Sequence, residues 1–424
     1  MSLNRRITGI LALSLVLSAC GSGSGGDSGA SSGGTSEKAE ISYAIWDKND
    51  QPGTLKIIEA FEKKNPTIKV KLEVTPWDQY WTKLQTAVTG GAAPDVFWMN
   101  PLNLRLYAKS GVILPVDESK IDLSGFPQPI VDSHRYEGKL YGTPRDLSVT
   151  GLWYNKELFD QAGVKYPTAD WTWDDFRAAA QKLTIPDKKQ YGFLSYRWDQ
   201  GGFYNTIFQA GGYVISPDGK KSGYDDPNTI KGLEFWTDLI AKDKVSPSAQ
   251  VMSDSDLLAL FMSGKYAMAF GGSWFGALYK ANTETGKKVD IAPLPKGPAK
   301  AATVMMGLSN VVWAKGKHQE QSAEFARFLA TEEALKILSE SGGASLPALP
   351  SARDAYYKSF PDYHLKEMVD ASVPNGVPFP VSINTAKWLA VQDKLLPEAW
   401  AGTRPTADVA KEIATQMNEI LAKE

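Results

Sequence analysis

Residues 41–74 read ISYAIWDKNDQPGTLKIIEAFEKKNPTIKVKLEV, and this stretch decides the fold class. Its first six residues are rich in β-forming side chains and end on Trp46. Residues 53–64 carry apolar side chains at helical spacing with charges between them, which predicts a helix. Residues 67–74 alternate apolar and polar side chains, the pattern of a half-buried strand.

The alternation of strand and helix continues beyond this stretch. Residues 77–89 have the apolar spacing of a second helix, and residues 95–98 form a short apolar run typical of a strand. This order predicts a parallel α/β sheet with helices on both faces. Ligands of such sheets bind beyond the carboxyl ends of the strands, where loops start at Trp46–Asp47 and at Trp98–Asn100.

Length and composition narrow the class of protein. A chain of 424 residues is too long for one core, so we expect two lobes. The formal net charge is −2, from 46 basic and 48 acidic residues, which argues against a nucleic-acid partner. Three histidines and the lack of a zinc, phosphate-loop or dinucleotide motif lead us to expect no metal and no cofactor. The 13 Trp, 17 Tyr and 16 Phe exceed what packing alone explains.

The first 38 residues look like an export and anchoring segment. Arg5 and Arg6 precede an apolar run that is much shorter than the roughly 20 residues of a membrane span, as in a signal peptide. Residues 17–20, Leu-Ser-Ala-Cys, resemble the lipobox of bacterial lipoproteins, which implies a signal peptide over 1–19 and a lipid on the Cys20 thiol. Residues 20–38, mostly Gly and Ser, would be a flexible tether. We therefore expect a lipid anchor at the extracellular face of the cell membrane.

The second half of the chain shows the alternation of strands and helices less clearly. Apolar runs predict strands at 147–154, 266–270 and 311–313. Thr172 is placed to cap a helix over 171–183, with two aspartates in its first turn. Further helices are predicted at 228–243, 254–263, 319–330, 332–341 and 407–423.

Seven segments, taken in order, resemble the family of extracellular solute-binding proteins that serve sugar ABC importers, the group that includes maltose-binding protein. Each segment alone is a weak signal, but their order behind a lipobox and a tether is specific. The segments are EAFEKKNPTIKVKLEV (59–74), WDQYWTKLQTAVTGGAAPDVFWMN (77–100), YGTPRDLSVTGLWYNKELFDQAGV (141–164), TWDDFRAAAQKLT (172–184), FMSGKYAMAFGGSW (261–274), PLPKG (293–297) and AEFARFLATEEA (323–334).

The resemblance implies a two-lobe, type II periplasmic-binding-protein-like α/β fold, in which each lobe is a mixed sheet flanked by helices and the ligand lies in a hinged cleft. It implies a carrier that closes on a sugar or oligosaccharide and delivers it to membrane permease subunits, without catalysis. We expect a monomer. The expected lobes are 41–146 with 293–348 and 147–292 with 349–424, with crossings near 143–150, 292–297 and 345–352.

Sugar chemistry suggests which residues would bind. A pyranose has partly apolar ring faces, which aromatic side chains cover, and a rim of hydroxyls, which short polar side chains satisfy. Tryptophan beside Asp or Asn on loops is therefore the expected pattern, and each such residue could instead serve packing or capping. The resemblance adds Asp146, Trp274, Gly307 and Trp388. The candidates are Trp46, Asp47, Trp98, Asn100, Asp146, Trp198, Asp199, Asn205, Trp274, Gly307 and Trp388.

Other functions remain compatible with these residues. A cell-surface glycoside hydrolase needs two carboxylates across a sugar cleft, and Asp47 and Asp146 could face one another. The same fold could carry an oligopeptide, or a polyamine held by Asp47, Asp146 and Asp199 among aromatic rings. A polyol phosphate would need a basic cleft, for which few arginines are available.

Overall fold

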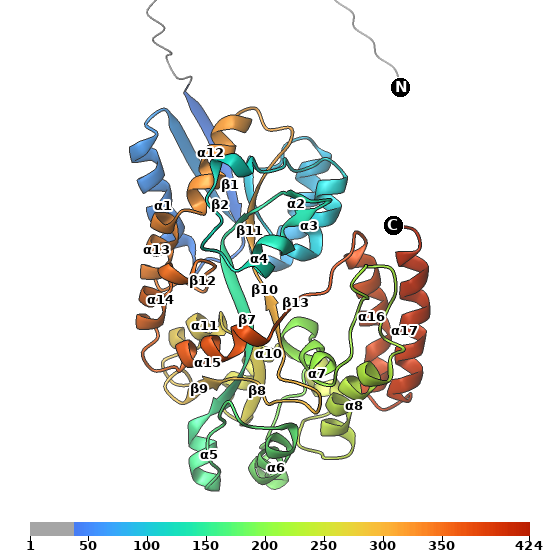
Figure 1. Ribbon diagram of the computed structural model, residues 1–424. Coiled ribbons are helices and arrows are strands. Elements are labelled where there is room, and N and C mark those ends of the chain that lie inside the picture. The colour runs from blue at the N-terminus through green and yellow to red at the C-terminus, as the bar shows by residue number, and fades with distance from the viewer. Residues whose placement is uncertain (1–37) are drawn as a thin grey trace, which may run out of the picture. The chain divides into compact units, whose positions relative to one another are not determined.

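The computed structural model describes residues 38–424, so the predicted signal peptide and Cys20 lie outside the described residues. Within residues 38–424, no helix combines the length and the apolar character that crossing a membrane requires. The described chain is built on two main sheets with helices around them (Figure 1).

The first sheet has five strands in the order β2-β1-β3-β11-β6. Strand β1 pairs in parallel with β2 and β3, and β11 runs antiparallel to β3 and β6. The strands predicted at 41–46, 67–74 and 95–98 and the helices predicted at 53–64 and 77–89 are confirmed, with ends shifted by two residues or fewer. The strands are β1 (Ala39–Ile45), β2 (Ile68–Val74), β3 (Val96–Met99), β6 (Thr143–Pro144) and β11 (Ser309–Val312). The helices near this sheet are α1 (Gln51–Lys64), α2 (Trp77–Thr89), α3 (Pro101–Lys109), α4 (Gln128–Ser133), α12 (Gln319–Leu329) and α13 (Glu332–Glu340).

The second sheet is organised around β7 (Asp146–Asn155), a long and almost wholly buried strand. Near its start β7 pairs with β12 and β10, and near its end it pairs with β8 and β9. Strand β10 also pairs in parallel with β13. The other strands of this sheet are β8 (Met268–Gly272), β9 (Val289–Ala292), β10 (Thr303–Met306), β12 (Leu346–Pro347) and β13 (Gly376–Pro378). A separate hairpin joins β4 (Arg135–Tyr136) to β5 (Lys139–Leu140).

Helices surround the second sheet, and several end the chain. The strands predicted at 147–154 and 266–270 and the helices predicted at 171–183, 228–243 and 407–423 are confirmed with small shifts of their ends. The helices are α5 (Lys156–Ala162), α6 (Trp173–Leu183), α7 (Tyr204–Gln209), α8 (Pro227–Ala241), α9 (Ala249–Ser253), α10 (Leu257–Met262), α11 (Phe275–Ala281), α14 (Asp354–Lys358), α15 (Leu365–Ser372), α16 (Thr385–Trp400) and α17 (Thr406–Leu421). Short turns are η1 (Glu118–Lys120), η2 (Pro186–Lys188), η3 (Asp199–Phe203), η4 (Pro350–Ala352) and η5 (Val373–Asn375).

The chain passes between the two sheets at three places. These passages are the residue that joins β6 to β7, the two residues that join β10 to β11, and the segment from α13 to β12. The sequence placed the second passage near 292–297, whereas β10 still belongs to the second sheet. The reason is that residues 293–297 stay beside α6, where Lys296 donates its backbone N–H to Trp171 O, and only Gly307–Leu308 lead to the first sheet.

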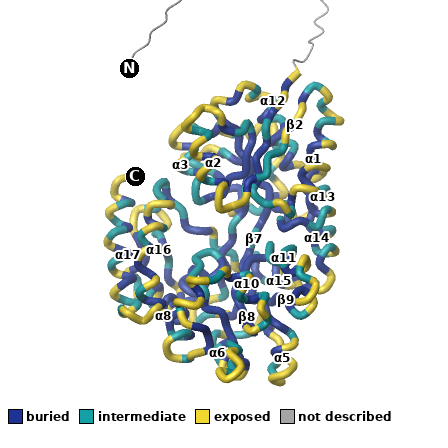
Figure 2. Tube along the Cα trace, turned by 180° about the vertical axis from the view of Figure 1, so that it is seen from behind, coloured by how far each residue is buried: buried dark blue, intermediate teal, exposed yellow. Residues whose placement is uncertain are grey.

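Local sequence explains where helices begin. Thr172 caps α6 as predicted, because its hydroxyl accepts from the Asp175 N–H while the Asp175 carboxylate accepts from the Thr172 N–H. Asn100 caps α3 in a related way, with Pro101 at the first helical position. Figure 2 shows strands β7 and β8 buried, whereas the edge strand β2 and the outer helix faces are more exposed. The caps therefore fix the ends of helices whose inner faces cover the sheets.

Candidate ligand-binding site

A cavity of about 410 Å³ lies where the two sheets meet, within the range of small-molecule sites. Seven of the predicted residues line it, and they come from both halves of the chain. These seven are Trp46, Asp47, Trp98, Asn100, Asp146, Trp198 and Trp274. The other lining residues are Trp77, Leu147, Ser148, Gln200, Ser273, Leu278, Met306, Leu308, Ala344, Ser345 and Leu346.

The position of the first-sheet residues follows from the topology. Trp46 and Asp47 come directly after β1, and Asn100 directly after β3, so they lie at the carboxyl ends of neighbouring parallel strands. This is the edge at which open α/β sheets bind ligands. The strand order read from residues 41–98 is therefore sufficient to bring these residues together.

One wall of the cavity is an aromatic cluster on the first sheet. The Trp46 ring makes edge-to-face contacts with Trp77 at 5.2 Å, Tyr80 at 5.0 Å and Trp98 at 4.9 Å between centroids. Trp98 is 1% exposed, and its indole N–H donates to the Tyr43 hydroxyl at 2.7 Å. Such pairs add stability beyond their buried area, so the wall has a fixed shape.

The opposite wall carries Trp198 and Trp274, whose rings meet edge to face at 5.9 Å. Both indoles lie close against glycine. A Cβ atom on Gly201 would come within 1.9 Å of the Trp198 ring, and one on Gly272 within 2.0 Å of the Trp274 ring. The glycines in RWDQGG and GGSW thus let each loop fold its tryptophan onto its own backbone.

Asp47 and Asn100 supply polar groups at the first wall. The Asn49 N–H donates to Asp47 Oδ1 at 2.8 Å, and the Asn49 side chain lies close to the same carboxyl group. Burial, together with the nearby charge of Asp50, raises the pKa of Asp47. Asn100 Oδ1 accepts from Asn103, whereas Asn100 Nδ2 makes no hydrogen bond within residues 38–424. The wall therefore presents a carboxyl group and an amide group to the cavity.

The floor of the cavity lies at the passages between the sheets, where three buried charged residues and one serine form what we call the hinge cluster: Asp50, Arg145, Asp146 and Ser345. Asp146 and Ser345 line the cavity, and Asp50 and Arg145 lie behind them. Arg145 Nη2 donates to Asp50 Oδ2 at 2.8 Å, and Arg145 Nη1 to Asp146 Oδ2 at 2.9 Å. The guanidinium carbon lies 4.0 Å from the centre of the Trp98 ring. The hinge cluster thus connects directly to the first aromatic wall.

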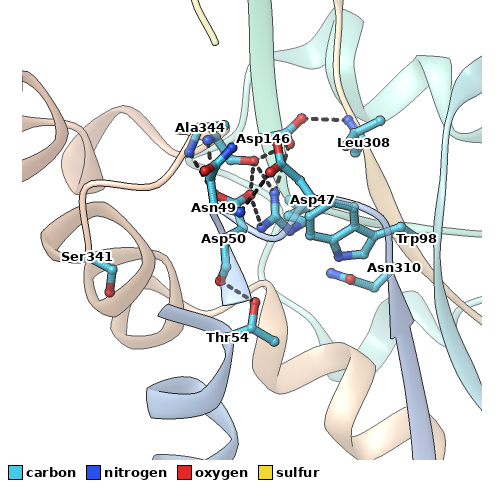
Figure 3. Close-up of polar contacts among 12 residues, drawn as sticks. Asp47, Asn49, Asp50, Thr54, Trp98, Asp146, Leu308, Asn310, Ser341 and Ala344 are labelled. Carbon is cyan, nitrogen blue, oxygen red and sulfur yellow. Dashed lines mark hydrogen bonds and ion pairs between the residues drawn. The ribbon is translucent and has the colours of Figure 1, made fainter. Parts of the chain in front are cut away.

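Other groups of the same segments complete the hinge cluster. Asp50 Oδ1 accepts from the Ala344 N–H at 2.8 Å, and Asp146 Oδ1 accepts from the Leu308 N–H at 2.7 Å (Figure 3). The Arg145 backbone N–H donates to Leu308 O at 2.9 Å, and its carbonyl accepts from the Ala348 N–H at 3.1 Å. Arg145, which is itself the first passage, thus bonds to Leu308 of the second passage and, through Nη1, to Ser345 of the third.

Burial and pairing act in opposite directions on these charges. Burial raises the pKa of Asp146, although the Arg145 guanidinium opposes the rise. Burial alone would lower the pKa of Arg145, but Asp50 and Asp146 outweigh it and raise the pKa. Arg145 stays charged, and each of its two carboxylate partners has both oxygens in hydrogen bonds.

Four predicted site residues do not line the cavity. Asn205 is fully buried, since its amide donates to Gln200 O and Gly202 O and accepts from the Val304 N–H, which holds η3 against β10. Asp199 starts η3 and accepts from the Gln200 N–H, and burial raises its pKa to about 6. Both residues shape the loop behind Trp198 instead of facing the cavity.

Gly307 and Trp388 lie outside the cavity for different reasons. Gly307 sits between two lining residues, and a Cβ there would come within 2.4 Å of Asp146 O, so its smallness serves the passage between sheets. Trp388 is 0% exposed in α16, where its indole N–H donates to Ser382 Oγ at 3.0 Å. The expected aromatic contact from this late helix is thus part of the core.

Sequence reasoning missed several lining residues. Trp77 sits four residues before Trp81 on α2, so helical spacing suggests a packing role for it. Ser345 and Gln200 follow no pattern, because only the tertiary fold brings their segments to the cavity. Among the described residues, no group of three or more His, Cys, Asp or Glu is arranged to hold a metal ion.

Several known proteins resemble this chain over most of its length. A putative binding protein of Brucella abortus is 24% identical over 91% of this chain and 94% of its own. The diacetylchitobiose-binding protein of Streptomyces coelicolor is 25% identical over 98% of both chains. A substrate-binding protein of Listeria monocytogenes, solved in complex with cycloalternan, is 28% identical with a TM-score of 0.82, covering 91% of this chain and 100% of that one.

These likenesses agree with the architecture, which is the two-lobe fold of type II periplasmic binding proteins with the cavity between sheets of the two lobes. The expected fold class is therefore confirmed. Residues 46–336 match the family described as bacterial extracellular solute-binding protein, and the chain belongs to this family.

Proposed function

We propose that the protein binds a carbohydrate in the cavity between its lobes and hands it unaltered to the permease of an ABC importer. The observation that carries this proposal is the pair of aromatic walls facing one cavity, with polar side chains between them. Ring faces of a sugar suit the indoles, and its hydroxyls suit Asp47, Asn100 and Ser148. Relatives named for multiple sugars and for galactooligosaccharides support the carbohydrate class.

The hydrogen bonds of Asp146 are consistent with binding without catalysis. Both oxygens of Asp146 are held by protein groups, so this residue is poorly placed to act as a nucleophile or general acid. We infer that the lobes close on the sugar by movement at the three passages, and that a ligand favours the closed form by as much as it binds that form better. We also propose that the protein is a monomer and that a lipid on Cys20 anchors it at the extracellular face of the cell membrane.

A direct test is isothermal calorimetry of the purified protein with mono- and oligosaccharides, spermidine and a polyol phosphate. We expect binding of at least one saccharide, a raised melting temperature in its presence, and no new sugar fragments by chromatography after prolonged incubation. Binding of spermidine alone, or cleavage of the saccharide, would contradict the proposal. Replacing Cys20 with Ala in cells should release the protein from the membrane fraction.

A further inference from the structure

We propose that Trp77 forms an outer subsite of the cavity, which makes the preferred ligand an oligosaccharide of at least two rings. This inference rests on the proposed carbohydrate function and adds the length of the ligand. Trp77 is 50% exposed although it lines the cavity, whereas Trp98, in the same wall beside the hinge cluster, is 1% exposed. The two residues therefore mark the outer and inner ends of the same wall.

Trp46 is the centre of the first wall, and Trp77 is its open member. The ring of Trp46 is surrounded by Trp77, Tyr80, Trp81 and Trp98, all within 5.8 Å between centroids. These four rings leave Trp46 only partly exposed. Trp77 contacts only Trp46 and Trp81 among aromatic residues of the described chain, so it presents the larger free surface.

The orientation of Trp77 is fixed before any ligand arrives. It is the first residue of α2, directly after Pro76, and its ring meets Trp46 at 74° and Trp81 at 88°. A ring held on two sides loses little conformational freedom when a ligand stacks on it. Trp77 is thus exposed but held in one orientation, which suits it to stacking on a ligand.

The angles between rings imply more than one sugar ring. The two faces of a pyranose chair are roughly parallel, so one sugar ring stacks well only on indoles whose planes are nearly parallel. The planes of Trp46 and Trp77 differ by 74°. On the opposite wall, Trp198 and Trp274 differ by 83°. A ligand that uses the inner indoles and Trp77 together must therefore contain at least two rings joined by a linkage that turns between them.

The test is calorimetry of wild type, Trp77→Ala and Trp274→Ala against malto-, cello-, chito- and galacto-oligosaccharides of one to five rings. We expect Trp77→Ala to weaken binding about tenfold for the longer members of the bound series, which corresponds to about 1.4 kcal/mol, and to leave the shortest bound member unchanged. Trp274→Ala should weaken every length. Leu55→Ala, which removes a similarly exposed apolar side chain outside the cavity, is the control and should change nothing.

A second readout does not depend on affinity. Acrylamide quenching of tryptophan fluorescence should fall when the long saccharide binds, and this protection should be largely lost in Trp77→Phe. Equal weakening of all lengths by Trp77→Ala, or no weakening at any length, would overturn the outer subsite while leaving carbohydrate binding intact. Failure of wild type to bind any of these saccharides would overturn the proposed function and this inference with it.

Discussion

The floor of the cavity and its walls are built on opposite principles. In the hinge cluster every charge is paired, and both oxygens of Asp50 and of Asp146 accept hydrogen bonds from the protein. On the walls, Trp77 keeps half of its surface exposed, and the Asp47 carboxyl group, which lines the cavity, has no cation paired with it within residues 38–424. The difference separates two tasks: the floor specifies the shape of the protein, and the walls leave groups free for a ligand.

The hinge cluster gives the largest expected effect. Arg145→Met would leave Asp50 and Asp146 buried without a counter-charge, so the free energy of unfolding should fall by about 3–5 kcal/mol. Urea denaturation followed by circular dichroism measures this change. The control is Arg135→Met, since Arg135 pairs with Glu118 at the surface and its loss should cost about 0–1 kcal/mol. Equal losses in both variants would show that the hinge cluster has no special weight.

Substitutions of two tryptophans, with the next largest expected effects, should separate ligand binding from stability. Trp274→Ala should weaken saccharide binding about 10- to 100-fold, or 1.4–2.8 kcal/mol, with little loss of stability because Trp274 is only partly buried. Trp388→Phe should do the reverse, since it removes a buried hydrogen bond to Ser382 far from the cavity and should cost about 1–3 kcal/mol of stability. Calorimetry and thermal melting of both variants check the pattern. Reduced affinity in Trp388→Phe would return this residue to the site.

How far the sequence leads depends on the range of the interaction. Strand order and helix ends are local, and residues 41–98 alone predict that Trp46, Asp47, Trp98 and Asn100 meet at one edge. The glycine-flanked loop around Trp198 is also local, whereas Trp274 was predicted from the family resemblance. Ser345 joins the site only through tertiary contacts with Asp50 and Asp146, about 200 residues or more away, and no spacing rule reaches it.

Trp388 and Trp77 show that the sequence also does not tell whether an aromatic side chain faces the core or the cavity. Trp388 was expected in the cavity because of a family pattern, but helix α16 turns that indole toward Ser382. Trp77 was overlooked because helical spacing cannot tell whether the apolar side of α2 ends at the core or at an open cavity. A residue at the boundary between the two needs the packed structure to be assigned.

His134 contrasts with the paired charges of the hinge cluster, because it is a buried titratable residue whose ring is not paired within residues 38–424. Its ring nitrogens make no hydrogen bond within the described chain, and burial lowers its pKa from 6.5 to about 3. Between these values the unfolded chain binds more protons, so stability falls as the pH falls below 6.5. At pH 5 this cost is about 2 kcal/mol, from about 1.36 kcal/mol per pH unit.

His134→Leu removes this titration and keeps an apolar side chain in the buried position. The difference in unfolding free energy between pH 7 and pH 5 should therefore be about 2 kcal/mol smaller in His134→Leu than in wild type. Denaturant melts at both pH values measure it. His364→Leu is the opposite case, because Asp290 raises the pKa of His364, so its loss should make the difference between pH 7 and pH 5 larger. An unchanged pH dependence in His134→Leu would mean that the folded ring titrates near its ordinary pKa of 6.5, which would contradict the lowered value.

Gly272 gives the smallest effect, and it tests how the second wall is made. A Cβ atom at this position would lie 2.0 Å from the Trp274 ring, so Gly272→Ala must push the indole away from the backbone. Crowding of this kind costs about 1–3 kcal/mol, and we expect the lower end, as a roughly fivefold loss of saccharide affinity. Gly276→Ala in the next helix is the control, because its nearest neighbour would lie 3.3 Å away.

The double variant decides whether this loss acts through the indole. If Gly272 matters only because Trp274 lies on it, then Gly272→Ala should cost nothing further in a protein that already carries Trp274→Ala, since the two sites share one interaction. Calorimetry of the four proteins of this cycle measures the coupling. Additive losses would show that the glycine serves strand β8 itself, and the second wall would then owe its shape to the sheet, as the first wall does.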